Sequence, residues 1–437
     1  MMQATHRSTA IPAVTVTLAG LLISGCVEPP GGSGTPPGEM VQSAKPRVTV
    51  PAVPRADLAE LVAGNSAFAF ELYQQAREEP GNIFCSPYSI SLALAMTYAG
   101  ARGETEQQMA DALHFTLPQE RLHTAFNALD LELAGRGEGA AGADGEGFRL
   151  NIVNRLWGQV DYVFLAEFLD VLAENYGAGL CLLDFANEPE PSRLEINDWV
   201  SDQTEGRIED LLLPGAISSL TRLVLTNAIY FNAAWDAPFD EDLTNDGPFH
   251  LLDGSTVSAA MMRQEETLGY AAGDGWQAVE LLYDGEELSM VILLPDAGHF
   301  EEFERTLGAV QFSGLLASLT PERIDLSMPR FTFEWSTSLK DVLSALGMPI
   351  AFGGAADFSG MTGRPELFID NVLHKAFVAV SEEGTEAAAA TAVVMNLTAA
   401  PPAARVVTVD RPFVFLIRDI ETGAILFVGR VVDPSGA

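Results

Sequence analysis

The chain has 437 residues, of which 60 are acidic and 24 basic, and its formal net charge is −36. So acidic a chain is poorly suited to binding nucleic acid or a polyanionic cofactor of the heparin kind. Adaptation to high salt is a further explanation of the acidity.

The first residues form a pattern typical of an export signal. Arg7 precedes an apolar stretch from Ile11 to Ile23, which is shorter than the run of about 20 apolar residues that a membrane-spanning helix needs. Ile23-Ser24-Gly25-Cys26 resembles a bacterial lipobox, in which the cysteine is lipid-modified and becomes the new N-terminus. We expect residues 1–25 to be a lipoprotein signal peptide, and the alternative is an ordinary signal peptide with an incidental cysteine.

Residues 26–54 are rich in proline and glycine, as in the run EPPGGSGTPPGE. They contain too few apolar residues to build a core, so we expect a tether that joins a lipidated Cys26 to one folded region over residues 55–437. The protein would then be exported and anchored to the bacterial cell envelope, on its periplasmic or extracellular face. We expect it to be a monomer that contacts the membrane only through the lipid.

Helical and strand-like patterns divide the folded region. Between Leu58 and Leu113 apolar residues recur at helical spacing. The Gly- and Ala-rich stretch from Gly135 to Gly147 is expected to be a flexible surface loop. Strand-like runs come later, and this order favours an α+β fold over a repeating βαβ arrangement. The predicted strands cover Leu223–Phe231, Leu288–Leu294, Ile369–Val380, Val406–Val409, Phe413–Ile417 and Ile425–Val431.

The chain carries no motif for catalysis or for a metal. It has no Cys-x-x-Cys, His-Glu-x-x-His, Gly-x-Ser-x-Gly or phosphate-binding glycine loop, so we predict neither an enzyme nor a cofactor. Apart from Cys26, the cysteines are Cys85 and Cys181. Each stands among apolar residues, which favours buried free thiols, with a disulfide as the alternative.

The most informative segment is EEGTEAAAATAVVMNLT, from Glu382 to Thr398. Gly384 permits backbone angles that other residues resist, so it can act as a hinge. Between Thr385 and Thr391 only Glu386 is bulky, and every second side chain could slide under a β-sheet. This pattern is typical of a segment that lies outside a sheet and can later join it as a strand, although an Ala-rich run is also a good helix former. In a strand, one face would carry Thr385, Ala387, Ala389 and Thr391, and the other Glu386, Ala388 and Ala390.

Several blocks of the sequence resemble the serpins, the serine protease inhibitor family. EEGTEAAAATAVV is similar to the proximal hinge of inhibitory members, and Asp410–Pro434 resembles the family's C-terminal strands. Asn82–Leu113, Asn197–Leu212 and Leu223–Phe239 match further family blocks in the same order. The resemblance implies an α+β serpin fold with three β-sheets, about nine helices and an exposed reactive-centre loop.

The resemblance also implies suicide inhibition of a serine protease. The protease would attack the loop and form an acyl-enzyme, and the freed hinge segment would enter the central sheet, a mode of strand addition for which serpin loop insertion is itself a standard example. The native state is then metastable, and the partner is a protease held in a covalent complex. The alternative is a non-inhibitory serpin, a carrier or chaperone, but such members commonly have bulky or charged hinge residues. A secreted enzyme would need a nucleophile and base that no motif indicates.

Matching to the family places the reactive bond and the hinge. The bond is expected at Thr398–Ala399, or one residue earlier at Leu397–Thr398. None of these residues is basic, so an elastase-, subtilisin- or chymotrypsin-like target is favoured over a trypsin-like one. The hinge is expected to comprise Glu382, Glu383, Gly384, Thr385, Glu386, Ala387, Ala388, Ala389 and Ala390.

Two further regions follow from the resemblance. Ser86, Ser89, Asn227 and His374 match the family's shutter, where a polar network would steady the closed sheet. Trp235, Arg330 and Glu382 match its breach, where an ion pair between Arg330 and Glu382 is our hypothesis. In some serpins a basic helix binds a sulfated polysaccharide, but the matching stretch, Leu122–Ala134, has no lysine or arginine. We therefore expect no heparin-type cofactor.

Overall fold

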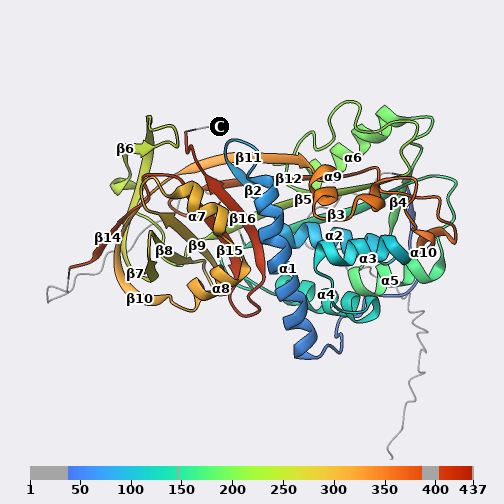
Figure 1. Cartoon of the computed structure of the whole chain (residues 1–437), viewed down its shortest axis with the longest axis horizontal. Coiled ribbons are helices and arrows are strands. Elements are labelled where there is room, and N and C mark those ends of the chain that lie inside the picture. The colour runs from blue at the N-terminus through green and yellow to red at the C-terminus, as the bar shows by residue number, and fades with distance from the viewer. Residues whose placement is uncertain (1–37, 144, 146, 386–402, 436–437) are drawn as a thin grey trace, which may run out of the picture. The chain divides into compact units, whose positions relative to one another are not determined.

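The structure is a computed structural model that describes residues 38–143, 145, 147–385 and 403–435. Within these residues it has ten α-helices, two short 3₁₀ helices and sixteen strands in two sheets (Figure 1), which confirms the α+β class. The α-helices are α1 (Arg55–Ala76), α2 (Pro87–Tyr98), α3 (Gly103–Leu113), α4 (Gln119–Ala134), α5 (Ala166–Tyr176), α6 (Pro189–Gln203), α7 (Phe300–Thr306), α8 (Ala309–Leu316), α9 (Lys340–Ala345) and α10 (Ser359–Thr362), and the 3₁₀ helices are η1 (Glu241–Leu243) and η2 (Pro349–Phe352). The strands are β1 (Glu39–Val41), β2 (Ile83–Cys85), β3 (Arg149–Gln159), β4 (Leu180–Leu183), β5 (Leu223–Ala234), β6 (Asn245–His250), β7 (Thr256–Gly273), β8 (Trp276–Leu282), β9 (Leu288–Pro295), β10 (Thr320–Pro329), β11 (Phe331–Ser338), β12 (Asn371–Val380), β13 (Gly384–Thr385), β14 (Arg405–Thr408), β15 (Phe413–Asp419) and β16 (Ile425–Val431).

The first sheet has seven strands in the order β1-β4-β3-β5-β13-β12-β11. Its strand β5 is buried along nearly its whole length because both faces are covered. Leu225 and Ile229 pack into the main core on one face, while Val224 and Ala228 pack with Trp199 of α6 on the other. Cover on both faces explains why β5 reads as a continuous apolar run rather than an alternating one.

The second sheet has the order β14-β10-β7-β8-β9-β15-β16-β2, and β6 pairs with β7. Its strand β7 is 18 residues long, and it pairs first with β6 and then with β8 while β10 lines its other edge. Because this long strand joins both groups of strands, the described residues form two sheets in place of the expected three.

Short-range signals set the start of α2 within the predicted helical region. The region from Leu58 to Leu113 contains α1, α2 and α3, but β2 interrupts it. Directly after β2, Ser86 caps α2 by accepting a hydrogen bond from Ser89 N–H (3.2 Å). Pro87 follows at the first helical position, where its missing N–H is not needed.

Both described cysteines are buried free thiols, as predicted. Cys85 lies in β2 and Cys181 in β4. Burial raises the pKa of the Cys85 thiol to about 12, so it remains protonated at neutral pH and is a poor nucleophile.

The segment before α1 is part of the folded structure from Glu39 onward. β1 pairs antiparallel with β4 and forms one edge of the first sheet. Arg47 then reaches α4, where its Nε donates to Asn127 Oδ1 (2.8 Å) and its Nη2 to Asp130 Oδ2 (2.6 Å). The interpretation of residues 26–54 as a tether therefore does not hold from Glu39 onward, because backbone pairing and charged side chains hold a segment that has few apolar residues.

Replacing Arg47 with alanine is expected to lower the free energy of unfolding by about 1–3 kcal/mol, because Oδ1 of the buried Asn127 loses its donor. Lys45 provides a matched control. Its ammonium group pairs with Asp170 (3.0 Å) and Glu174 (3.1 Å), but its side chain is 48% exposed, so Lys45→Ala should cost less than about 1 kcal/mol. Urea denaturation measures both variants, and equally small effects would show that Arg47 does not hold this segment.

Part of the stretch from Gly135 to Gly147, at Ala141 and Ala143, lies against the end of β5. Ala143 is buried, and its N–H donates to Asn232 Oδ1 (2.7 Å). The carbonyl oxygen of Ala141 accepts a hydrogen bond from Ala234 N–H (3.1 Å). The prediction of a surface loop is wrong for Ala143, because its small side chain allows the backbone to lie close against β5.

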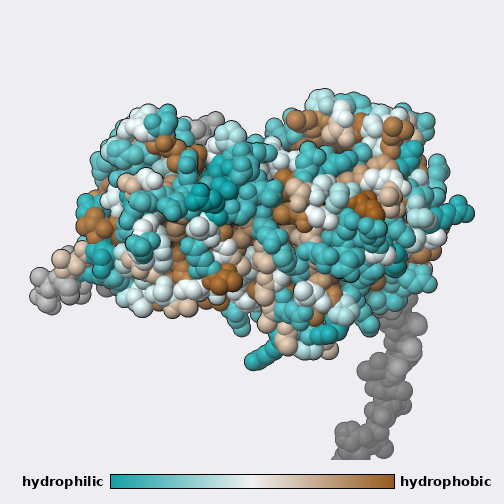
Figure 2. Space-filling model, in the orientation of Figure 1, coloured by the Kyte–Doolittle hydropathy of each residue, from teal (hydrophilic) through white to brown (hydrophobic). Residues whose placement is uncertain are grey.

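Hydrophilic residues cover most of the face shown in Figure 2, and the apolar side chains on it form small separate patches. This surface agrees with the large excess of acidic residues in the chain. None of the helices that the structure describes is long and apolar enough to span a membrane.

Candidate functional site

The first sheet is parted at one end by the first residues of the predicted hinge. β13 runs antiparallel to both of its neighbours, and Thr385 lies opposite Ala233 of β5 and Val380 of β12. At Ile229 and Ala376, and from there away from β13, β5 and β12 pair directly with each other in the parallel direction. The two strands therefore form a wedge that is open where β13 enters and closed farther along.

The chain that leaves β5 holds the hinge at the open end of the wedge. Trp235 N–H donates to the carbonyl oxygen of Glu383 (2.8 Å), and Trp235 Nε1–H donates to that of Ser381 (3.0 Å). Tyr283 stacks on Trp235 with the ring centroids 4.6 Å apart, and its hydroxyl hydrogen-bonds to Thr385 Oγ1 (2.8 Å). These contacts fix the first hinge residues to the end of β5.

Glu382 is buried and hydrogen-bonded at the same place. Its Oε1 accepts from Thr244 Oγ1 (2.5 Å), and its Oε2 lies 3.4 Å from Arg330 Nη1. The ion pair proposed from the sequence is thus present, although Arg330 is 51% exposed, which limits the pair to about 0–1 kcal/mol. Glu241 hydrogen-bonds to Glu383, and this contact with a second carboxylate raises the pKa of Glu241. The hinge therefore carries more negative charge than Arg330 balances.

Gly384 is required by a close approach of two backbones. A Cβ atom added at this position would lie 2.1 Å from the carbonyl oxygen of Ala233 and 2.8 Å from Cα of Ala234. Both are backbone atoms of β5, which cannot rotate away as a side chain can. Any other residue would therefore push β13 away from β5.

A polar cluster lies where β5 and β12 are closed. His374 of β12 is opposite Asn227 of β5, and its Nδ1 hydrogen-bonds to Asn227 Oδ1. His374 Nε2 accepts from Ser86 N–H (3.3 Å), and Asn227 Nδ2 donates to Ser89 Oγ (2.6 Å). Asn154 of β3 accepts from Asn227 Nδ2 (2.5 Å) and donates to the carbonyl oxygen of Ser89 (3.1 Å). The structure thus joins the four residues expected in the shutter and adds Asn154, so that the cluster ties three strands to α2.

Burial and hydrogen bonding fix the protonation of two histidines. His374 Nε2 accepts a hydrogen bond, so the proton is on Nδ1 and the ring is neutral. Burial lowers the pKa of His374 to about 3. His123 hydrogen-bonds through Nδ1 to the Tyr176 hydroxyl (2.6 Å), and burial, assisted by the charge of Arg102, lowers its pKa to about 3. In the unfolded chain both pKa values return to about 6.5.

Acidification is expected to destabilise the protein from about pH 6.5 downward. The unfolded chain takes up a proton at each of these histidines, while the folded chain takes up none until about pH 3, so stability falls by about 1.4 kcal/mol per pH unit for each histidine. His374→Gln should remove about half of this slope. Denaturant titrations between about pH 5 and 6.5 avoid most carboxylates. A pH-independent free energy of unfolding in this range would contradict two neutral buried histidines.

Some predicted residues fall outside the described residues. These are the hinge residues Glu386, Ala387, Ala388, Ala389 and Ala390, the bonds around Leu397, Thr398 and Ala399, and Cys26. In contrast, Thr244, Tyr283 and Asn154 contact predicted site residues, but no sequence pattern predicted that they belong to the site. They stand in no motif, so nothing in the sequence singled them out.

The fold and the hinge define a class of protein, one whose central sheet accepts the first residues of a chain segment as an extra strand. The family model described as Serpin (serine protease inhibitor) matches residues 63–434. The chain is 41% identical over 371 residues to an uncharacterized serpin-like protein of Thermococcus kodakarensis, over 84% of each chain. It is also 41% identical over 389 residues to the leukocyte elastase inhibitor of Bos taurus, over 86% of this chain and 100% of that protein. The chain belongs to the serpin family.

The solved structures agree with this assignment. The crystal structure of the thermophilic serpin tengpin in the native state matches with a TM-score of 0.79 and 28% identity, over 90% of this chain and 100% of tengpin. Relatives named as elastase inhibitors support protease inhibition as the general function, with a protease as the partner.

Proposed function

We propose that this protein inhibits a serine protease by suicide-substrate trapping. The protease serine attacks the carbonyl carbon of Thr398, or of Leu397, the peptide bond to the next residue breaks, and an ester joins the two proteins. The segment after Thr385 then inserts between β5 and β12 and carries the protease with it. The similarity to a leukocyte elastase inhibitor and the apolar or small residues at both bonds favour an elastase-, subtilisin- or chymotrypsin-like target.

The wedge between β5 and β12 carries this proposal. These strands are parallel neighbours, and β13 runs antiparallel to both. Continued insertion would replace one parallel pairing by two antiparallel pairings, which are slightly more stable per residue. About a dozen residues that each gain roughly 1 kcal/mol from strand hydrogen bonds would yield on the order of 10 kcal/mol. This is comparable to the whole stability of a domain, about 5–15 kcal/mol, and is enough to distort a protease active site.

The register of β13 supports the same direction of insertion. Thr385 lies opposite Ala233, so a strand that continued would place Ala387 opposite Phe231. Directly opposite residues share a face of a sheet, and Phe231 belongs to the main core. Every second side chain of the inserted segment would therefore face the core, and these side chains are small enough to enter without displacing core residues.

Mixing the full chain with pancreatic elastase, subtilisin and chymotrypsin tests the proposal on a denaturing gel. We expect a band at the summed mass and a released peptide that begins at Ala399 or Thr398. Trypsin serves as the control, because its pocket needs a basic residue and should yield no complex at these bonds. Clean cleavage without a covalent complex and without a gain in thermal stability would contradict trapping and favour a carrier or chaperone.

The flanks of the stretch Leu122–Ala134 support a function without a polyanionic cofactor. The stretch has no basic residue, and the arginines on either side are already paired. Arg121 binds Asp57 (2.6 Å), and Arg136 binds Asp419 (2.7 Å). Both of these arginines in the described part of the chain are thus balanced by carboxylates, which makes α4 a poor site for a sulfated polysaccharide.

We further propose that the protein is exported and anchored to the bacterial envelope through a lipid on Cys26, as a monomer. The lipobox-like residues before Cys26 support this proposal. Cys26→Ser should move the protein from the membrane fraction to the soluble fraction, and mass spectrometry of the wild-type N-terminus should find a diacylglyceryl group. A variant that stays with the membrane would contradict lipidation as the anchor.

A further inference from the structure

Glu386 is the only bulky residue in the stretch from Thr385 to Thr391, which insertion would carry into the first sheet. The register of β13 predicts where its side chain would go. Since Thr385 lies opposite Ala233 of β5, a strand that continued would place Glu386 opposite Asn232. Asn232 is fully buried, so the inserted carboxylate would enter a place that water hardly reaches. A buried carboxylate is unfavourable unless a charged or hydrogen-bonding partner meets it there.

Asn232 faces the side of the first sheet that α6 covers. Ala228 of the same strand packs with α6, and alternate residues of a strand share a face, so Tyr230 and Asn232 also point to this side. Arg149 of β3 lies directly opposite Asn232 and therefore shares its face. An inserted Glu386 would lie in the same row as these two residues, on the far side of Asn232 from Arg149.

This row is rich in hydrogen-bond donors. The Tyr230 hydroxyl accepts from Asn232 Nδ2 (3.2 Å) and from Arg149 Nη2 (3.4 Å). Asn151, two residues after Arg149 on the same face of β3, is 8% exposed, and its Nδ2 donates to no described residue. Most buried donors in proteins have an acceptor. A carboxylate brought into the row would add acceptors to a cluster that already holds an unsatisfied donor, so the row is suited to an anion.

Arg149 is already paired, but with a partner that can be exchanged. Its Nε lies 3.2 Å from Glu205 Oε1, and the Glu205 side chain is 47% exposed. Glu205 lies just past the end of α6 with a φ of 54°, in the left-handed region that residues other than glycine rarely adopt. An ion pair with so exposed a partner contributes little to stability. A carboxylate that is fixed in the sheet can therefore replace it.

We propose that Arg149 binds the Glu386 carboxylate when the loop inserts. The guanidinium group exchanges Glu205 for Glu386, which also accepts a hydrogen bond from Asn232 Nδ2. The Cα atoms of Arg149 and Glu386 would be two strands apart, about 10 Å, a distance that an extended arginine and a glutamate span together. Arg149 is thus a positioning residue for insertion, which fixes the residue directly after Thr385. This role rests on the proposed function, because only insertion brings Glu386 into the sheet.

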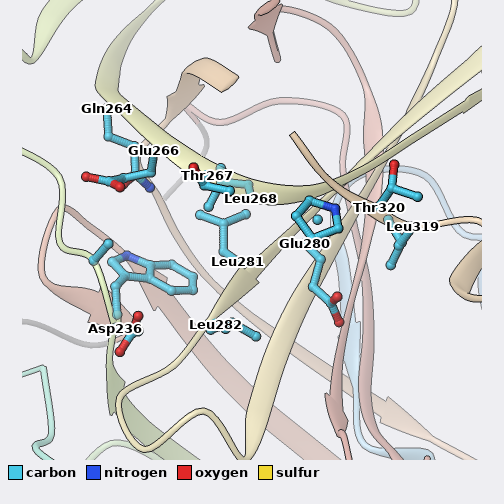
Figure 3. A pocket seen from close by; sticks show the side chains of 14 residues that line it. Asp236, Gln264, Glu266, Thr267, Leu268, Glu280, Leu281, Leu282, Leu319 and Thr320 are labelled. Atoms are coloured by element: carbon cyan, nitrogen blue, oxygen red, sulfur yellow. The ribbon is translucent and has the colours of Figure 1, made fainter. Parts of the chain in front are cut away.

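The cavity beside the hinge offers no comparable partner for Glu386 (Figure 3). No lysine, arginine or histidine is among the described residues that line it. Its acidic lining residues are Asp236, Glu266 and Glu280. These carboxylates would repel a further one, so the inserted side chain is directed to the α6 side of the sheet.

A double-mutant cycle on the cleaved chain tests the pairing without a serine protease. Thermolysin cleaves with a zinc-activated water and forms no acyl-enzyme, so it can cut the loop of the full chain and allow insertion. Glu386→Gln and Arg149→Met should each raise the unfolding rate of the cleaved chain in guanidinium chloride about three- to tenfold. The double variant should unfold no faster than the faster single variant, because both substitutions remove the same interaction.

In the intact chain the same two substitutions should act independently, since Glu386 has not yet entered the sheet. Arg149→Lys keeps a positive charge and should restore most of the kinetic stability of the cleaved chain. This rescue would not be expected if Arg149 only filled space. Independent effects in the cleaved chain, or a lysine variant as unstable as Arg149→Met, would overturn the assignment.

Arg222→Met is the matched control. Arg222 precedes the opposite end of β5, and its guanidinium group donates to two backbone carbonyl oxygens (3.0 and 2.8 Å), so it should not couple to Glu386. Arg207 provides a second comparison, because its guanidinium group lies over the ring of a β12 phenylalanine (5.9 Å) on the other side of the gap. Coupling of Glu386 to Arg207 in place of Arg149 would overturn the proposal.

The yield of trapped protease separates this proposal from the proposed function. With elastase, the ratio of covalent complex to cleaved chain should fall about threefold or more in Glu386→Gln and in Arg149→Met. An unchanged ratio would overturn a role of the pair in trapping. If the wild type itself forms no complex, the proposed function fails, while the cycle on the thermolysin-cleaved chain still decides whether Arg149 binds Glu386. A cleaved wild type that gains no kinetic stability would overturn insertion and the pairing together.

Discussion

The variant Thr385→Arg is expected to lose covalent trapping while its loop is still cleaved. Thr385 is buried at the point where β13 enters the sheet, and insertion requires this side chain to lie on the core side opposite Ala233. An arginine can avoid burial before insertion only by withdrawing from the sheet, and burying its unpaired guanidinium group when the strand inserts then costs several kcal/mol. A penalty of about 3 kcal/mol would shift the partition between trapping and hydrolysis about 100-fold toward hydrolysis, since 1.4 kcal/mol is a factor of ten.

The measurement is the ratio of covalent complex to cleaved chain after reaction with elastase. Thr385→Ser keeps the hydroxyl that bonds to Tyr283 (2.8 Å) and is small, so it should trap like the wild type. The arginine variant should also show no gain in thermal stability after cleavage. A wild-type yield of complex from Thr385→Arg would contradict insertion that starts at β13.

Glu382→Lys is expected to release the hinge and to promote polymers on mild heating. Lysine cannot accept the hydrogen bond from Thr244 (2.5 Å), and its charge would lie beside Arg330 in a position where the native side chain is 3% exposed. Burial of the ammonium group and loss of the acceptor should destabilise the closed arrangement by about 2–5 kcal/mol. The nearby carboxylates of Glu241 and Glu383 offset part of the charge but do not replace the acceptor.

Arg330→Ala and Glu382→Gln distinguish burial from the ion pair. Arg330 is half exposed, so its removal should cost at most about 1 kcal/mol, and Glu382→Gln keeps an acceptor for Thr244. Native gels after incubation at increasing temperature report polymers directly. If Arg330→Ala polymerises as readily as Glu382→Lys, then the ion pair holds the hinge; if neither does, Glu382 has no such role.

The strands that could be predicted are those in which the pattern of apolar residues matches the pattern of burial. β5, β9 and β16 are buried along their length and read as apolar runs, while β12 alternates between buried and half-buried residues. β7 was missed because its middle, Arg263–Thr267, is polar and mostly exposed. Its strand conformation depends on β10 and β8, which come later in the chain.

The functional residues show the same division. Gly384, Thr385, Ser86, Ser89 and Asn227 lie in blocks that resemble a family, and His374 matches a further family position, so these residues followed from the resemblance. Tyr283 and Asn154 could not be predicted in this way, because each acts through a residue on another strand. Their partners are defined by which strands become neighbours, and this information is spread over the whole chain.

The pairing of β2 with β16 determines when the second sheet can form during synthesis. Cys85 of β2 lies opposite Val428 of β16, which also pairs with β15. A pairing between residues so distant in sequence has a high entropic cost of loop closure. We therefore expect it to form slowly and late in folding. Nearly the whole chain must therefore leave the ribosome before the second sheet can close. During synthesis the edge of β2 that later pairs with β16 is unpaired and can accept β16 of another copy. Release of the chain before its own β16 has paired therefore favours domain-swapped oligomers.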